Sequence, residues 1–128
     1  MKLLIALTLL FSTSYIKSQN ESLNGVWADS SSKSFQNCYA VFAVKKDSVF
    51  MTHYVEFNGQ PFVEHGKGLI KDGKLQYTVK VTLQIPGWTT TEGQHILSLD
   101  SDGKTLRGTY SDNTGNKGPL VFKKKWPK

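Results

Sequence analysis

Three histidines, His53, His65 and His95, are the side chains of this sequence best suited to binding a metal ion or moving a proton. A three-histidine zinc site needs its ligands to converge on one point. The three residues are far apart in sequence, and no tight His-x-His or His-x-x-x-His pair is present. The spacing favours packed, hydrogen-bonded histidines, and we expect neither a metal nor another cofactor.

Catalytic motifs are missing from the sequence. It contains no Gly-x-Ser-x-Gly elbow and no phosphate-cradling glycine loop. Cys38, the single cysteine, has no local motif and lies beside an apolar run, which predicts a buried structural thiol. An acid–base pair of distant residues, such as His53 with Glu64, stays open because spatial neighbours are not visible in a sequence. The expectation is a protein that is not an enzyme.

The first eighteen residues resemble an export signal. Lys2 provides a positive start, residues 3–11 form an apolar run too short to span a bilayer, and small residues follow up to Ser18. We predict a signal peptide at 1–18 and one domain at 19–128 that is secreted or periplasmic, without membrane insertion. Loss of Lys2 and Lys17 lowers the 16 basic residues to 14 against 10 acidic ones, a net charge of +4. The charges are dispersed, so a nucleic-acid partner is not expected.

Short β-rich runs separated by turn dipeptides dominate the rest of the chain. Asn58-Gly59, Asp72-Gly73 and Asp102-Gly103 are dipeptides that readily adopt the backbone of hairpin turns. Residues 75–85 alternate between apolar and polar side chains, which predicts a strand with one buried face. The same reasoning predicts eight strands, at 22–28, 38–44, 48–57, 60–70, 75–85, 93–100, 105–111 and 119–125.

Eight sequential antiparallel strands favour an all-β, up-and-down barrel, because closure removes the exposed edges of an open sheet. A β-sandwich is the alternative. The connections are of hairpin length rather than the long crossovers of a Greek key, which favours the barrel.

Two short motifs resemble the lipocalin-like proteins of the calycin superfamily: Gly25-Val26-Trp27 and Gly108-Thr109-Tyr110. The resemblance implies that Trp27 closes one end of the barrel beneath a basic side chain from a late strand. Arg107, the only arginine, is the expected partner, with Lys123 as the next choice. Gly25, Trp27 and Arg107 are therefore predicted to form the barrel plug.

The same resemblance implies a cup that holds a small molecule. On residues 48–57 the more apolar of the two alternating sets contains His53, which is therefore expected to face inward. The odd-numbered connections share one end of the barrel and are predicted to form its mouth; they are residues 28–37, the Asn58-Gly59 turn, residues 86–93 and residues 112–118. The expected ligand contacts are Met51, His53, Tyr77, Trp88 and Tyr110.

Two functions follow from this interpretation, and the partner is either a small apolar molecule or a secreted protein. The first is an exported binding protein with an open cup. The alternative is a loop-mediated interaction module, such as an inhibitor of a secreted enzyme, which requires a packed interior and an exposed Trp88. Either would be a monomer or a small homo-oligomer.

Overall fold

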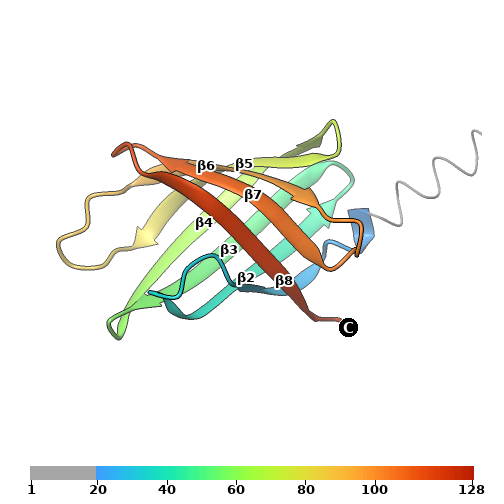
Figure 1. Cartoon of the computed structure of the whole chain (residues 1–128). Coiled ribbons are helices and arrows are strands. Elements are labelled where there is room, and N and C mark those ends of the chain that lie inside the picture. Colours follow the sequence, from blue (N-terminus) through green and yellow to red (C-terminus); the bar gives the residue numbers. More distant parts are fainter. Residues whose placement is uncertain (1–19) are drawn as a thin grey trace, which may run out of the picture.

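The chain forms a closed eight-stranded antiparallel barrel (Figure 1). The structure, a computed structural model, describes residues 20–128, and the predicted signal peptide lies outside them. Each strand pairs with the next in sequence, and the first pairs with the last. The barrel prediction is confirmed and the sandwich alternative is wrong. The strands are β1 (Gly25–Asp29), β2 (Gln36–Lys45), β3 (Ser48–Phe57), β4 (Gln60–Lys71), β5 (Lys74–Leu83), β6 (Glu92–Leu99), β7 (Thr105–Asp112) and β8 (Lys117–Trp126). Within the described residues, no helix has the length and apolar character needed to cross a membrane.

Two of the three predicted hairpin turns have the expected geometry. Asn58-Gly59 and Asp72-Gly73 have positive φ at both residues, as two-residue turns between right-twisted strands require. In Asp102-Gly103 only the glycine has positive φ. This connection is longer, and the Asp102 carboxylate accepts hydrogen bonds from the backbone of Lys104 and Thr105 at 2.8 and 3.0 Å.

The predicted alternation holds on β3 and fails at the end of β5. The buried residues of β3 are Val49, Met51, His53 and Val55. On β5, Tyr77 and Val79 are buried, but Leu83 is 45% exposed. An irregularity pairs Glu64 with Val81 and Val63 with Leu83, so one extra residue of β5 turns Leu83 to the outside.

Trp27 lies buried at the end of the barrel where the first and last strands pair. Its side chain is fully buried, its Nε1–H donates to the carbonyl of Leu23 at 3.0 Å, and its ring meets Phe42 edge-on. Gly25 has a φ of 128°, and a Cβ there would lie 2.0 Å from the Trp126 carbonyl oxygen. Only glycine therefore allows β1 to enter the sheet against β8, which gives the Gly-x-Trp motif a steric reason.

The predicted partner of Trp27 is wrong. Lys124, rather than Arg107 or Lys123, places its Nζ 4.9 Å from the centre of the Trp27 ring, and it donates to the carbonyls of Ser22 (2.6 Å) and Asn24. The β1–β8 register pairs Trp27 with Lys124 after an irregularity. Arg107 lies on the outside of β7, where its Nε is 3.3 Å from the Asp100 carboxylate.

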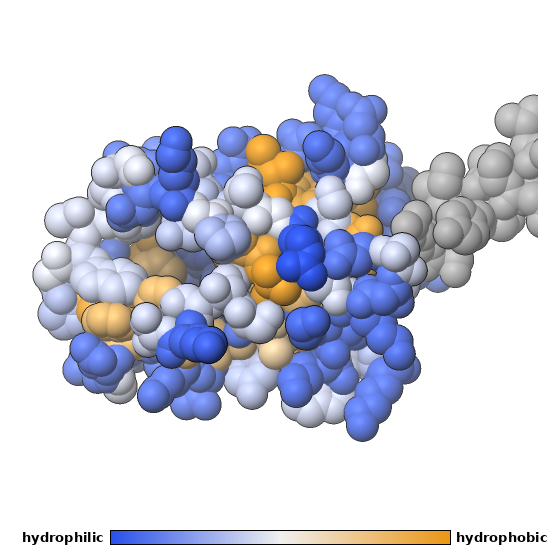
Figure 2. All heavy atoms as spheres, viewed as in Figure 1, coloured by the Kyte–Doolittle hydropathy of each residue, from blue (hydrophilic) through white to orange (hydrophobic). Residues whose placement is uncertain are grey.

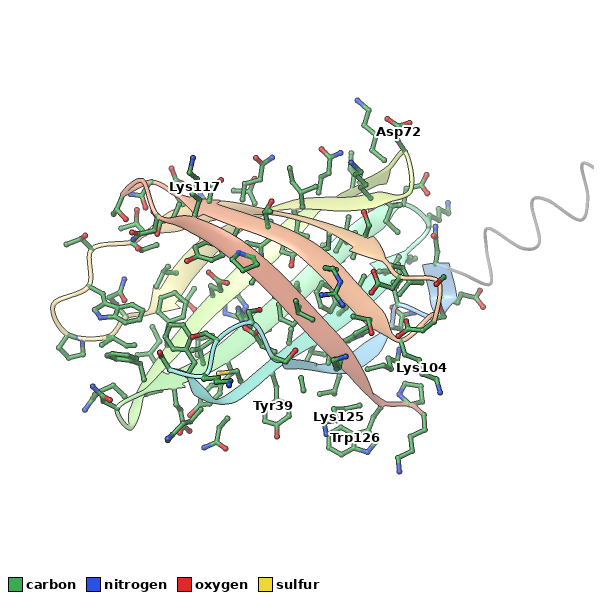
Figure 3. The ribbon with its side chains drawn as sticks, viewed as in Figure 1. Tyr39, Asp72, Lys104, Lys117, Lys125 and Trp126 are labelled. Carbon is green, nitrogen blue, oxygen red and sulfur yellow. The ribbon has the colours of Figure 1, made fainter. Side chains whose placement is uncertain are left out.

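The barrel wall carries two exposed aromatic side chains and one buried thiol. Tyr39 and Trp126 point away from the barrel (Figure 3) and are 40% and 56% exposed. Cys38 is buried, and its Sγ–H donates to the carbonyl of Gln36 at 3.1 Å. The buried structural thiol expected from the sequence is therefore confirmed.

Candidate ligand-binding site

A cavity of about 680 Å³ occupies the end of the barrel opposite Trp27. It is bounded by residues of the β1–β2, β5–β6 and β7–β8 connections, which are three of the four loops predicted to form the mouth. In the space-filling view this end is hollowed, with apolar side chains inside a polar rim (Figure 2). The Asn58-Gly59 turn does not line the cavity.

The rim is held by hydrogen bonds between two of these loops. The Asp112 carboxylate accepts from Thr90 at 3.0 Å and from the Thr114 hydroxyl at 2.7 Å. Asn113 bridges to Thr91 through backbone and side-chain bonds of 3.0 and 2.9 Å. Burial would raise the pKa of Asp112, but the hydrogen bonds that its own carboxylate accepts outweigh burial and lower the pKa to about 2. These bonds connect the β5–β6 and β7–β8 loops to each other.

One wall of the cavity is aromatic and is built around Trp88. The Trp88 ring lies 6.1 Å from Phe35, 5.3 Å from Phe57 and 6.0 Å from Phe62, centre to centre. These contacts leave Trp88 half-buried rather than exposed. The loop-mediated alternative requires an exposed Trp88 and a packed interior. The half-buried Trp88 contradicts the first requirement, and the cavity contradicts the second.

The inner end of the cavity is polar and centres on His53. Its Nε2 lies 3.0 Å from Oδ2 of Asp29, and its Nδ1 lies 2.9 Å from Oε1 of Glu64. An ionised carboxylate only accepts hydrogen bonds, so His53 donates from both nitrogens and is an imidazolium. Burial would lower the pKa of His53, but the bonds to Asp29 and Glu64 raise it to about 9. Burial likewise opposes ionisation of Asp29, yet His53 and Ser31 hold the pKa of its carboxyl below the usual value.

His95 and Tyr77 extend this arrangement as neutral groups. The Tyr77 hydroxyl is 3.0 Å from Nδ1 of His95, and Nε2 of His95 is 3.5 Å from Oε1 of Glu64. Burial lowers the pKa of His95 to about 4 and raises that of Tyr77 well above its ordinary value. This pattern of bonds places the proton of His95 on Nε2, toward Glu64, with Tyr77 donating to Nδ1.

The structure separates the five predicted ligand contacts into two groups. His53, Trp88 and Tyr110 line the cavity. Met51 and Tyr77 face inward but lie deeper, in the packed core near Trp27, so their prediction as lining residues is wrong. A Cβ at Gly66 would lie 2.7 Å from the Tyr77 ring and 3.3 Å from Met51, so this glycine lets both side chains fill the barrel. Alternation in a strand predicts the face a residue occupies but not its depth.

The site also contains three groups that were not predicted as ligand contacts: Asp29, Glu64 and His95. Glu64 had a usable signal, because the Asn58-Gly59 turn fixes the hairpin register and pairs it with His53. Asp29 belongs to the predicted connection 28–37, and the position of His95 depends on closure of the whole sheet. The pair of His53 with Glu64, which the sequence alone does not decide, is formed in the structure.

The three histidines do not converge. His53 and His95 have ring centres 6.3 Å apart, whereas His65 lies exposed on the outer face, bonded to Thr52 at 3.1 Å. Among residues 20–128, no cluster of three or more His, Cys, Asp or Glu side chains is arranged to hold a metal ion.

Comparisons with known proteins support the architecture alone. No protein-family model matches the chain, and no curated protein sequence matches it. Among solved structures, the chain is similar to a redesigned β-barrel, mFAP1, determined in complex with DFHBI. The match has a TM-score of 0.59 and 14% sequence identity, and covers 83% of this chain and 98% of that one. The small-molecule complex is a property of that barrel.

Proposed function

We propose that this protein is an exported, lipocalin-like carrier that holds one small, largely apolar molecule in the open end of its barrel. The observation that supports this proposal is the cavity of about 680 Å³, which is within the range typical of small-molecule sites. Its aromatic wall provides apolar contact area, and the hydrogen bonds between its rim loops restrict their motion, which reduces the entropic cost of binding. The resemblance through Gly25-Val26-Trp27 is consistent with the same function.

Binding, rather than catalysis, is the second part of the proposal. Both ring nitrogens of His53 are bonded to carboxylates, and Nδ1 of His95 is bonded to Tyr77. Neither histidine therefore offers a free basic nitrogen to a molecule in the cavity, as a general base must. This argument favours a carrier over an enzyme.

The first experiment is native mass spectrometry of protein purified gently from its producing cells, with a denatured control. An extra mass that disappears on denaturation is the expected result. The intact mass also tests export, because removal of residues 1–18 leaves a chain that begins at Gln19. A full-length chain in the cell interior would contradict the export proposal.

A matched pair of variants localises binding to the cavity. Val55→Trp adds bulk to a buried lining residue, whereas Val41→Trp adds the same bulk on the outer face, where Val41 is 49% exposed. The neutral fluorescent probe N-phenyl-1-naphthylamine should bind the wild type and Val41→Trp but not Val55→Trp, with circular dichroism confirming that all three fold. Equal binding by both variants, or none by the wild type, would refute the carrier.

A further inference from the structure

The inner end of the cavity carries a net negative charge. Asp29 and Glu64 contribute two negative charges and His53 one positive charge, through bonds of 3.0 and 2.9 Å. His95 and Tyr77, the other titratable groups bonded within this arrangement, are neutral. The side chains of Asp29 and Glu64 are each only 8% exposed, so solvent screens this charge weakly.

The sign of this charge is opposite to that of the chain as a whole. The sequence has 16 basic and 10 acidic residues. The described lining of the cavity nevertheless includes Asp29, Glu64 and Asp112 and contains no lysine or arginine. A chain rich in lysine therefore keeps its basic groups off this surface, which disfavours an anionic ligand.

One carboxylate oxygen at the inner end is available to a ligand. Oε1 of Glu64 faces both His53 and His95, whereas Oε2 forms no hydrogen bond with any residue in 20–128. In that same part of the chain, every fully buried side-chain polar atom has a partner. Oε2 is therefore not sealed inside the protein but reaches the cavity that Glu64 lines.

We propose that the ligand of this cavity is an organic cation, whose protonated nitrogen donates to Oε2 of Glu64 and whose apolar body lies against the aromatic wall around Trp88. The inference rests on the proposed carrier function and adds the chemical class of the ligand, an amine with an apolar or aromatic body. An ammonium group offsets the net charge and satisfies Oε2. A neutral apolar molecule would strip water from Oε2 without replacing the hydrogen bond, which costs binding energy.

Three probes that share an indole body test this inference by displacing N-phenyl-1-naphthylamine at pH 7. Tryptamine is a cation, tryptophol is its neutral alcohol counterpart, and indole-3-acetate is an anion. We expect tryptamine to displace the dye at about tenfold lower concentration than tryptophol, with indole-3-acetate the weakest. Tryptophol equal to or better than tryptamine would overturn the cation inference.

Two variants with the same change in total charge locate the effect. Glu64→Gln removes the charge at the inner end, and Glu56→Gln removes one from a partly exposed residue of the same hairpin, bonded to Tyr54 and Asn37 outside the cavity. The preference for tryptamine over tryptophol should disappear in Glu64→Gln and persist in Glu56→Gln. Loss in both variants, or in neither, overturns the role of Glu64. If Glu64→Gln does not fold, Asp29→Asn tests the charge at the inner end instead: it makes that end neutral and keeps Oε2 of Glu64, so the preference for tryptamine should weaken. An unchanged preference in Asp29→Asn would overturn the role of the net charge.

The two proposals fail in different ways. If the neutral dye binds and the indole probes show no preference for the cation, the carrier stands and the cation inference is wrong. If neither the dye nor tryptamine binds up to millimolar concentration, and native mass spectrometry finds only bare protein, the carrier itself is wrong.

Discussion

Raising the pH from 6.5 to 9 should destabilise the folded protein through a single residue, His53. A histidine with a pKa of about 9 when folded and 6.5 when unfolded binds more protons in the folded state between these values. Its contribution is fully present below pH 6.5 and is lost as the pH rises through 9. The difference corresponds to roughly 3 kcal/mol, of which most is lost by pH 9.

Below pH 6.5 the dependence of stability on pH has the opposite sign because of His95. Its pKa of about 4 in the folded state is below the unfolded value of 6.5, so the unfolded chain binds the extra proton between pH 6.5 and 4. Stability should therefore fall on acidification too, and the free energy of unfolding should be greatest near pH 6.5.

Urea unfolding followed by tryptophan fluorescence at pH 4.5, 6.5 and 9 measures this profile. From pH 6.5 to 9 the wild-type midpoint should fall by about 1–2 M urea. His65→Gln removes an exposed histidine from the outer face and should show the same fall in the midpoint. It is the control for loss of a histidine that does not belong to the buried cluster. In His53→Gln the fall in midpoint between pH 6.5 and 9 should be absent. A wild-type free energy of unfolding that is flat between pH 6.5 and 9 would refute the assignment of His53 as a buried cation.

Three further changes test the fold. Trp27→Ala should cost roughly 3–5 kcal/mol in the free energy of unfolding, and an unchanged melting midpoint would show that Trp27 does not close the barrel. Arg107→Gln should change stability by less than about 1 kcal/mol because its pair with Asp100 is exposed, whereas Lys124→Gln should cost more in the same thermal melts. Leu83→Thr should leave the free energy of unfolding, measured by urea titration, within about 0.5 kcal/mol of wild type, since the side chain faces water; a loss of several kcal/mol would place it in the core.

The strands and their closure could be predicted because each is encoded locally. Two-residue turns such as Asn58-Gly59 and the alternation on β3 depend on neighbours in sequence, and eight such strands leave few arrangements other than a barrel. The irregularity that exposes Leu83 was not predictable, because no residue type marks it. One extra residue there reverses which side chains face inward.

The polar end of the cavity was harder to predict because its members come from different strands. His53 and Glu64 belong to one hairpin, so its turn sets their pairing. Asp29 reaches His53 from the end of β1, and His95 reaches Glu64 from β6. Those contacts exist only once the sheet has closed. The choice of Lys124 over Arg107 likewise depends on the β1–β8 register, the last pairing needed to complete the barrel.

The position of the two chain ends has a practical consequence for handling this protein. Val26 pairs with Trp126, and Lys124 bonds to Ser22 and Asn24, so the first and last described segments lie together at the end closed by Trp27. In Figure 1 the C-terminus lies at the end opposite the β5–β6 and β7–β8 loops. A tether attached after Lys128 would therefore hold the barrel upright on a sensor chip or bead, with its opening facing the flowing solution.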